Sequence, residues 1–427
     1  MPLRLDSQSA DFPTRFRAFL GVKREATQDV EQAVRAIIAD VRARGDRALT
    51  ELTAKYDGVD LAKAGLRVTA TEINAAEKSC DAEALAALKL ARDRIEAFHQ
   101  RQQPRDTRFT DPLGVELGSR WSAIEAVGLY VPGGTAAYPS SVLMNVVPAR
   151  VAGVPRLVMV VPAPAPLVLA AARLVGVDEI YRIGGAQAVA ALAYGTETIA
   201  PVAKIVGPGN AYVAVAKRLV FGDVGIDMIA GPSEVLILAD KTGNVDWIAA
   251  DLLAQAEHDA SAQSVLITDD AVLAAQVEQA VELQLKTLAR ASVAGASWRD
   301  FGAIITVGRL DDAITLVDRL APEHLEIIAV DAEQLAARIR NAGAIFIGAH
   351  TPEVIGDYVA GSNHVLPTAR SARFSSGLGV VDFMKRTSLL KCGPEQLRAL
   401  GPAAITLGEA EGLSAHARSV AIRLNQR

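Results

Sequence analysis

The sequence has very little cysteine: Cys80 and Cys392 are its only two in 427 residues. Two cysteines so far apart in the chain cannot form a disulfide framework or a cysteine-based zinc site. This scarcity is typical of a protein from a reducing compartment, and we expect a cytoplasmic protein.

The sequence also lacks a membrane segment and an excess of positive charge. Its longest uncharged apolar run, residues 157–172, contains three prolines and is shorter than the roughly 20 residues of a membrane helix. Residues 1–17 are charged and have no apolar stretch of signal-peptide length. With 49 acidic against 44 basic residues, the net charge of -5 argues against nucleic-acid binding. We therefore expect no membrane and no nucleic acid among the partners.

What the sequence does contain is a succession of helix-like and strand-like patterns. Half of the residues are hydrophobic, and the length suits two or three domains. Residues 30–41 and 85–98 each place apolar side chains on one face of a helix, and Asp46 and Asp81 stand where helix caps are expected. We expect residues 115–117 and 124–131 to form paired strands.

Farther along the chain, strand-like runs alternate with helical patterns. The runs are residues 157–161, 180–183, 203–206, 235–238, 265–268, 303–307, 325–330 and 344–347. This alternation is typical of parallel, doubly wound α/β sheets, and so many strands favour two sheets over one. After Gly377 the alternation ends in a tail of about 50 residues, which is too short for an independent core. The tail must pack on its own chain or, as a sharper hypothesis, on a second subunit.

Glycine clusters mark three of the expected strand ends. No G-x-G-x-x-G fingerprint is present, but residues 130–134, 183–187 and 206–210 are glycine-rich. Tight strand–helix turns need glycine in any case. Three such clusters at strand ends nevertheless favour a nucleotide or similar ligand, whose phosphate a glycine turn lets approach a helix N-terminus.

Two of the six histidines have neighbours that suggest chemistry. His258 comes three residues after Gln255, so that both can lie on one helical face and offer nitrogen and oxygen to a cation such as zinc. The alternative is a polar helix end. His324 follows Glu323 directly before an apolar strand, which places two proton acceptors together. The alternative is a solvated loop, and ligands of open sheets usually bind at the other end of the strands.

The other histidines have weaker contexts. His364 lies in a glycine-punctuated polar stretch that also contains Asp357, a possible anionic ligand, and His416 follows Glu411 in the tail. A surface position is the default for both, and we expect the same for His99 and His350.

Taken together and in order, strings along nearly the whole chain resemble the histidinol dehydrogenase family. They are residues 125–135 (EAVGLYVPGGT), 184–188 (GGAQA), 206–210 (VGPGN), 230–234 (AGPSE), 255–258 (QAEH), 322–326 (PEHLE), 361–367 (GSNHVLP), 374–379 (FSSGLG) and 411–416 (EGLSAH). No functional position of the family is altered in this sequence.

The resemblance implies an enzyme that oxidises L-histidinol through the aldehyde to L-histidine, the end of histidine biosynthesis, with two NAD⁺ in sequence. It implies one zinc ion per subunit and a homodimer with shared active sites. The expected fold has two Rossmann-like doubly wound α/β domains without G-x-G-x-x-G, a helical N-terminal region and a C-terminal dimerisation tail. The expected division is an arm (1–24), a first domain with the metal and acid–base residues (25–125 and 236–376), a second domain on the NAD side (126–235) and the tail (377–427).

The resemblance also implies a role for each matched residue. The zinc ligands would be Gln255, His258, Asp357 and His416, and the acid–base pair would be Glu323 and His324. The substrate would contact Ser233, His364 and Glu411, together with the zinc ligands and His324. NAD would contact Tyr130, Gln187 and Asn210. His324 suits the base that removes the hydroxyl proton, and Glu323 suits activation of water in the second oxidation.

Two other functions remain open on the sequence. A relative on the same scaffold would oxidise another small polar alcohol, such as a hydroxylated sulfonate, although His364 and Glu411 favour histidinol. A non-catalytic metal-holding protein is the other alternative, and the Glu323–His324 pair argues against it.

Overall fold

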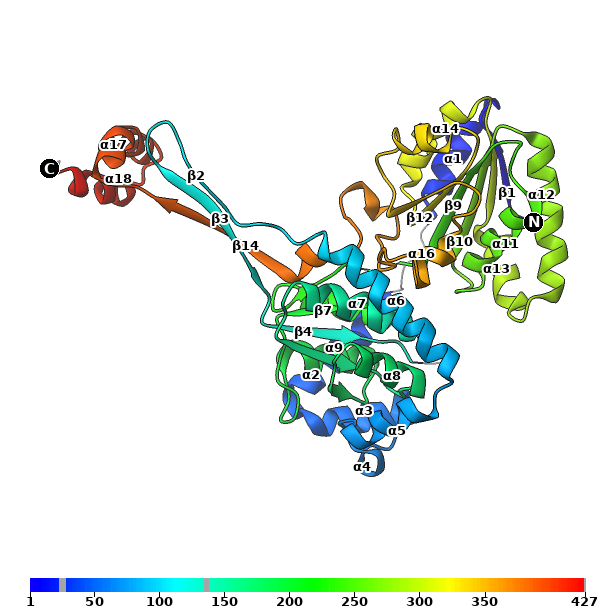
Figure 1. Ribbon diagram of the computed structural model, residues 1–427, viewed down its shortest axis with the longest axis horizontal. Coiled ribbons are helices and arrows are strands. Elements are labelled where there is room, and N and C mark those ends of the chain that lie inside the picture. Colours follow the sequence, from blue (N-terminus) through cyan, green and yellow to red (C-terminus); the bar gives the residue numbers. More distant parts are fainter. Residues whose placement is uncertain (23–27, 134–137, 230, 426–427) are drawn as a thin grey trace.

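The computed structural model describes residues 1–22, 28–133, 138–229 and 231–425. These residues form two parallel sheets and one antiparallel sheet, with helices packed on both parallel sheets (Figure 1). Among them, no helix is long and apolar enough to cross a bilayer. The predicted α/β fold with two parallel sheets is confirmed, and all eight predicted strand runs are strands. The predicted boundary at residues 24 and 25 lies outside the described residues, as does Gly134 of the first glycine cluster.

The larger parallel sheet has six strands in the order β1-β11-β10-β9-β12-β13. Their bounds are β1 Leu3–Asp6, β9 Glu234–Ala239, β10 Gln263–Thr268, β11 Ala303–Thr306, β12 His324–Ile328 and β13 Ala344–Ile347. Alternate residues of β9 face opposite layers, because side chains alternate along a strand: Val235 and Ile237 pack in one core, Leu236 and Leu238 in the other. The first core contains α11 (Val245–Ala256), α12 (Ala271–Gln284) and α13 (Ala291–Phe301), and the second α1 (Phe12–Leu20), α14 (Leu310–Leu320) and α15 (Ala332–Ala336).

The smaller parallel sheet has five strands in the order β6-β5-β4-β7-β8. Their bounds are β4 Ala126–Tyr130, β5 Arg156–Val160, β6 Glu179–Tyr181, β7 Lys204–Val206 and β8 Gly225–Ile226. One core holds α5 (Ala70–Ser79), α6 (Ala82–Gln100), α7 (Pro139–Val151) and α8 (Pro166–Leu174). The other holds α2 (Gln28–Arg44), α3 (Asp46–Tyr56), α9 (Gly185–Tyr194) and α10 (Ala211–Val220).

The core contacts differ from the predicted division of the chain. The helices of residues 28–100 bury their apolar faces on the five-stranded sheet, and not on the sheet that carries the acid–base residues. In addition, β1 belongs to the six-stranded sheet, where it pairs with β11. The amphipathic pattern of a helix shows which face is buried but not which sheet buries it, so the sequence did not determine this assignment.

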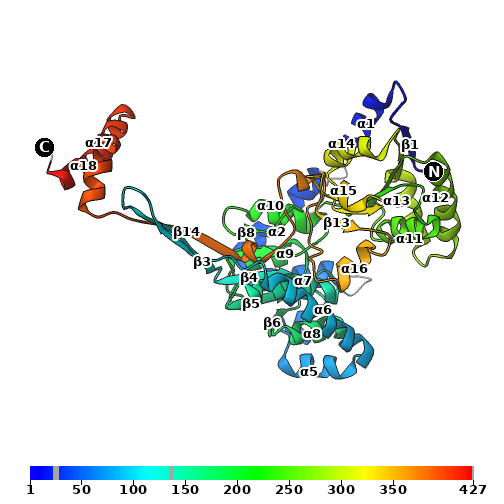
Figure 2. The same cartoon turned by 45° about the horizontal axis from the view of Figure 1, so that its top comes forward.

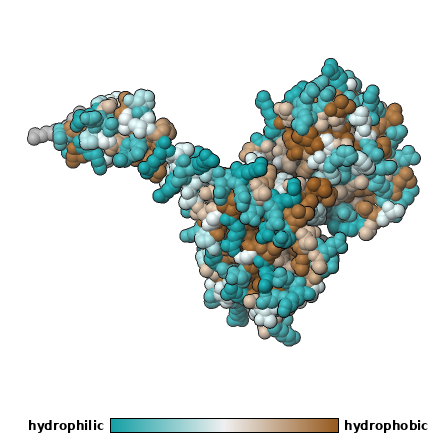
Figure 3. Space-filling view, viewed as in Figure 1, coloured by the Kyte–Doolittle hydropathy of each residue, from teal (hydrophilic) through white to brown (hydrophobic). Residues whose placement is uncertain are grey.

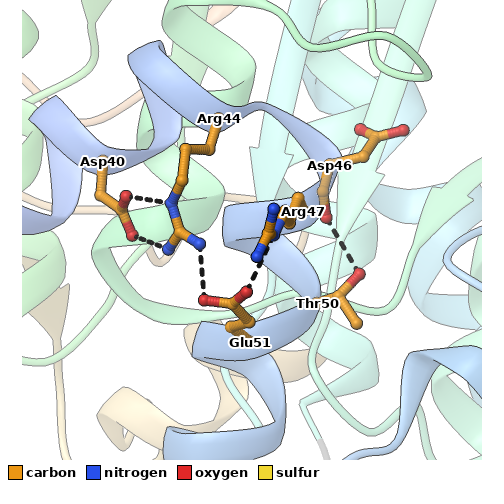
Figure 4. Close-up of polar contacts among 6 residues, drawn as sticks. All are labelled: Asp40, Arg44, Asp46, Arg47, Thr50 and Glu51. Atoms are coloured by element: carbon orange, nitrogen blue, oxygen red, sulfur yellow. Dashed lines mark hydrogen bonds and ion pairs between the residues drawn. The ribbon is translucent and has the colours of Figure 1, made fainter.

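A tight corner keeps α3 beside α2 (Figure 4). Arg44 donates two hydrogen bonds of 2.6 Å to Asp40 in α2 and one of 2.6 Å to Glu51 in α3. Gly45 forms the turn with a φ of +52°, which glycine adopts without strain. Gly45 is the N-cap of α3, so the predicted cap, Asp46, is instead its first helical residue.

The third sheet is an antiparallel ribbon in the order β14-β3-β2, formed by β2 (Thr107–Thr110), β3 (Glu116–Ala123) and β14 (Met384–Lys391). The predicted pairing of residues 115–117 with 124–131 is therefore wrong. Every residue of β4 is buried, because β4 lies between β5 and β7 in a parallel sheet, whereas β3 is partly exposed and pairs only in the ribbon.

The ribbon carries the tail, α17 (Pro394–Ala410) and α18 (Ser414–Ala421), away from both parallel sheets (Figures 1 and 2). In the space-filling view the tail joins the rest of the molecule through a narrow neck (Figure 3). The two helices pack closely, since a Cβ on Gly408 would lie 3.0 Å from the Ala417 nitrogen. Outside this contact Leu407 is 63% exposed and Ile422 is 55% exposed. The tail therefore leaves apolar surface uncovered in the single chain.

Candidate active site

The predicted acid–base pair lies at the amino edge of the six-stranded sheet. His324 is the first residue of β12, in register with Val235 of β9 and Ala344 of β13. Helix α11 ends at this same edge, because a helix between parallel strands runs back across the sheet. It places Gln255 in its last turn. His258 follows in a turn whose N–H donates to the Gln255 carbonyl at 3.2 Å, so His258 lies beyond the helix and not on its face as predicted.

A short helix and the loop after it complete this edge. Helix α16 (Glu353–Tyr358) carries Asp357, whose Oδ1 is 3.3 Å from His324 Nε2. His364 Nδ1 donates to the Asp357 carbonyl at 3.1 Å. Ser233 directly precedes β9 at the same edge. The structure thus brings together seven of the predicted residues: Ser233, Gln255, His258, Glu323, His324, Asp357 and His364.

Backbone contacts orient the acid–base pair. His324 Nδ1 lies 3.0 Å from the Glu234 carbonyl, which can only accept, so Nδ1 carries a hydrogen and donates it. The other nitrogen, Nε2, therefore faces Asp357 and is the ring position that exchanges protons. The Glu234 N–H donates to Glu323 Oε2 at 2.9 Å, so the same residue of β9 fixes both members of the pair.

Burial and charge shift the proton affinities of the pair in a way that suits proton transfer. Burial raises the pKa of Glu323 to about 7. Burial opposes protonation of His324, but the carboxyl groups of Glu323, Glu353 and Asp357 outweigh it and raise the His324 pKa well above 6.5. Burial also opposes ionisation of Asp357, whose pKa is nevertheless lowered by its contact with His324. A group whose pKa lies near neutrality exchanges protons most effectively, and Glu323 meets this condition.

The two remaining histidines are held in the form that binds a cation. Burial lowers the pKa of both His258 and His364, which favours the neutral imidazole. Among the described residues, the buried Gln255 Nε2 has no hydrogen-bond partner, and Asp357 Oδ1 has no partner besides His324 Nε2. Unpartnered buried polar atoms are rare, and the amide oxygen of Gln255 and the Asp357 carboxylate form, together with His258, a nitrogen and oxygen donor set that fits zinc. Within the described chain, no three His, Cys, Asp or Glu side chains are grouped to hold a metal ion. Of the four predicted zinc ligands, only two residues of these types lie at this edge, His258 and Asp357.

Three buried or half-buried carboxyl groups behind His324 were not predicted. Glu353 Oε2 lies 3.7 Å from His324 Nδ1, and the Glu353 N–H donates to Glu326 Oε1 at 2.6 Å. Asp251 of α11 faces Glu326, and the two carboxyl groups share a hydrogen bond. Burial raises the pKa of Asp251 to about 6, of Glu353 to about 8 and of Glu326 to about 9. A signal existed in the sequence, because Glu326 interrupts an otherwise apolar strand.

The two tail residues of the matched set lie elsewhere in the chain. Glu411 follows α17 and His416 lies in α18, at the far end of the ribbon from the six-stranded sheet (Figure 1). Both are exposed, and both line a surface hollow of about 660 Å³ between the tail helices, beside Leu407. A single chain therefore does not bring Glu411 and His416 to the other seven residues.

The predicted NAD contacts lie at the carboxyl edge of the five-stranded sheet. Tyr130 ends β4, and its buried hydroxyl accepts a 2.9 Å hydrogen bond from the Gly185 N–H at the start of α9. Gln187 is buried in the first turn of α9. Asn210 is exposed and caps α10, so its side-chain oxygen is engaged by the N–H groups of Tyr212 and Val213.

A buried ion pair holds the loop that carries Asn210. Gly207 donates its N–H to Asp227 Oδ2 at 2.8 Å and accepts from Lys217 Nζ at 3.0 Å, and Lys217 pairs with Asp227. Gly207 has a φ of +117°, and a Cβ there would lie 2.2 Å from the Tyr130 carbonyl oxygen. This glycine is thus required by backbone geometry at the point where β7 leaves the sheet.

His99 and His350 were both expected at the surface. His350 is exposed, but His99 is fully buried, and its Nδ1 donates to the Ile95 carbonyl at 2.7 Å. The expectation for His99 was therefore wrong, because α6 packs on α7 with this side inward.

The sequence and the fold are both similar to known proteins. The profile of the family described as histidinol dehydrogenase matches residues 21–424. A histidinol dehydrogenase of Bradyrhizobium diazoefficiens is 74% identical over 429 residues, which cover 100% of both chains. One of Rhodopseudomonas palustris is 72% identical over 431 residues, again with 100% of both chains covered. A crystal structure of histidinol dehydrogenase from Elizabethkingia anophelis superposes with a TM-score of 0.94 at 35% identity, over 99% of this chain and 98% of the other.

The buried carboxyl groups generate a prediction about stability. Glu326 has a folded pKa of about 9 against its usual 4.5, so between these values the folded chain retains a proton that the unfolded chain releases. The stabilisation of the folded state by that proton is complete below the usual pKa and is lost as the pH rises. Glu326→Gln, which mimics the protonated form, should therefore lose less stability than the wild type from about pH 5 to about pH 8. Urea unfolding at both pH values measures the difference.

The matched control is Glu333→Gln, which removes an exposed carboxyl group from α15, a helix that packs on the same six-stranded sheet. Its stability should follow that of the wild type at both pH values. Parallel pH dependence of the wild type and Glu326→Gln would show that Glu326 is ionised in the folded protein.

Proposed function

Because the chain belongs to the histidinol dehydrogenase family, we propose that it oxidises L-histidinol through L-histidinaldehyde to L-histidine, with reduction of two NAD⁺, at the end of histidine biosynthesis. The observation that carries this proposal is the arrangement around His324, whose Nε2 is directed into the group of predicted substrate and metal residues while Nδ1 is anchored on β9. The similar proteins of Bradyrhizobium diazoefficiens and Rhodopseudomonas palustris are both named histidinol dehydrogenase, which does not favour a different alcohol as substrate.

The first oxidation needs a base beside the substrate hydroxyl. As the alcohol carbon transfers a hydride to NAD⁺, the hydroxyl proton passes to His324 Nε2, and the aldehyde is formed. The ring does not turn during this transfer, because Nδ1 is held by the Glu234 carbonyl. Glu353, 3.7 Å from Nδ1, stabilises the imidazolium that results.

The second oxidation needs water. Glu323, with its pKa near 7, accepts a proton from water as the oxygen attacks the aldehyde carbon, and the His324 imidazolium returns its proton to the aldehyde oxygen, so that a hydrate is formed. Hydride transfer from the hydrate to the second NAD⁺ then gives the acid, and His324 again accepts the hydroxyl proton. No cysteine nucleophile is needed, and Cys80 and Cys392 belong to other parts of the fold.

Zinc would be held by Gln255, His258 and Asp357 of one chain and His416 of a second. When bound, it would fix the imidazole and amine of histidinol and so orient the reacting carbon. This set also bears on the pKa of His324. After Glu323 and Glu353, Asp357 is the third carboxyl group that raises this pKa in the single chain, and a carboxylate engaged with a cation would raise it less, which would favour Nε2 as a base.

We further propose a homodimer in which the tail of one chain completes the site of the other. Three observations support this: the tail carries Glu411 and His416, the ribbon holds it away from its own sheets, and its apolar surface is uncovered. NAD would bind at the carboxyl edge of the five-stranded sheet, beside Tyr130, Gln187 and Asn210, where open α/β sheets bind their ligands.

The function is tested by stoichiometry. If one site performs both oxidations, each histidinol consumed should yield two NADH, and little free aldehyde should appear. NADH absorbance and chromatographic measurement of histidine, histidinol and aldehyde provide the balance. A yield of one NADH with aldehyde released into the medium would contradict the two-step assignment.

The division of labour is tested by substitution. Glu323→Gln should slow oxidation of the aldehyde more than that of the alcohol, because only the aldehyde step needs activated water. His324→Asn should slow both, and losses of roughly 10²–10⁴-fold are expected for a removed general base. His350→Asn is the matched control, since it makes the same change at an exposed histidine. Small and equal effects of Glu323→Gln on both half-reactions would refute its assigned role.

The shared site is tested by mixing two inactive homodimers, Asp357→Ala and His416→Ala. After subunit exchange, one site of each mixed dimer contains both substitutions and the other contains neither. Random exchange makes half of the dimers mixed, so activity should return to about one quarter of the wild type. Native mass spectrometry verifies the exchange independently. If exchange occurs and no activity returns, each site is built from a single chain.

A further inference from the structure

The carboxyl group of Asp57 lies among the predicted NAD contacts, although no sequence pattern pointed to it. Asp57 follows the last turn of α3, and Gln187 Nε2 donates to its Oδ2 at 3.2 Å. The Gly184 N–H also donates to this carboxyl group, and the negative charge lies close enough to Tyr130 to affect its hydroxyl. Asp57 thus contacts the glycine turn of residues 183–187 from a different part of the chain.

These contacts change the role of that glycine turn. Two of the N–H groups at the start of α9 are already engaged, Gly184 with Asp57 and Gly185 with the Tyr130 hydroxyl. A phosphate at this helix start would meet the Asp57 carboxylate, and two of the N–H groups there would not be free to donate to it. The turn was expected to be a phosphate cradle, but its geometry is better suited to a neutral hydroxyl-bearing part of a ligand.

Accessibility also singles out Asp57. Gln187 is 1% exposed and Tyr130 is 5% exposed, so neither offers much surface to a ligand. Asp57 is half-buried and borders the solvent. Within the described part of the chain, no lysine or arginine forms an ion pair with it, so its charge is not neutralised locally.

We propose that Asp57 is a specificity-determining residue of the cofactor site, which accepts hydrogen bonds from the adenosine ribose hydroxyls of NAD and repels the 2′-phosphate of NADP. The proposal rests on the proposed function, because it assumes that the dinucleotide binds at this edge. Gln187 and Gly184 would then act as positioning groups that aim the carboxyl group at the ribose.

The chemistry of a carboxylate supports this role. Its two oxygens have about four acceptor positions, and the contacts with Gln187 and Gly184 leave others for hydroxyl donors. A phosphate group at the same place brings further negative charge, and partial burial strengthens the repulsion relative to bulk water. Burial also raises the pKa of Asp57 above its usual range, so discrimination should weaken as the pH falls and the carboxyl group takes up a proton.

The experiment measures equilibrium binding of NAD⁺ and NADP⁺ by titration calorimetry, at alkaline pH and without histidinol. Asp57→Asn keeps the size of the side chain and removes its charge. It should lower the ratio of the NADP⁺ dissociation constant to the NAD⁺ dissociation constant by about tenfold or more. Asp57→Glu keeps the charge and should retain the preference for NAD⁺. If the role of Asp57 were only structural, both variants would weaken the two cofactors alike.

Asp178→Asn is the matched control. Asp178 is exposed just before β6, at the opposite edge of the same sheet, so this variant makes the same change in net charge away from the site. Its ratio should equal that of the wild type. An unchanged ratio in Asp57→Asn, with thermal melting showing a folded protein, would overturn the proposal. Failure of the wild type to bind NAD⁺ would instead contradict the proposed function.

Discussion

A buried imidazole surrounded by carboxyl groups is the interaction on which the candidate site depends. His324 is buried at the start of β12. Burial alone would keep its imidazole neutral, but the charges of Glu323, Glu353 and Asp357 outweigh burial and favour the protonated ring. The same burial raises the proton affinity of Glu323 and Glu353. The proton equilibria of these groups are therefore coupled, so a change in the charge of one member shifts the pKa values of the others. A site that accepts and releases protons in two successive oxidations needs this property.

The two parallel sheets carry the predicted functional residues at opposite edges. In the five-stranded sheet the predicted cofactor residues follow the carboxyl ends of the strands, as the general rule for open sheets anticipates. In the six-stranded sheet His324 lies at the amino end of its strand, and the neighbouring residues come from the end of α11 and from α16. Glu323 and His324 therefore lie at the edge where open sheets rarely bind ligands, as their position before a strand suggested. The other side chains of the candidate site reach this edge because α11 ends there and α16 contributes Asp357.

The sequence predicted the strands of the parallel sheets well, because apolar runs bounded by turns carry a local signal. It missed β1 and β14, which lie at sheet edges and are short or polar, so that only their partners define them. It located most of the candidate site through strings that resemble one family. Glu353 and Asp57 escaped it, because each acquires its importance from contacts with distant segments, and tertiary contacts are not readable from one sequence. For the same reason, the sequence did not show on which sheet the helices of residues 28–100 pack.

The connectivity of the two parallel sheets differs in a way that bears on how the chain folds. The five-stranded sheet and its helices come from the continuous segment 28–226, whereas the six-stranded sheet joins Leu3 to Ala303 and Val235 to His324. Contacts between residues so far apart form slowly, because a long loop must close first. Most of the five-stranded half is thus able to fold while a ribosome is still extending the chain, and Val380 and Phe383 join one of its cores later. The six-stranded half, with the predicted acid–base pair, must wait for β13, and β1 has no strand with which to pair until β11 has been made.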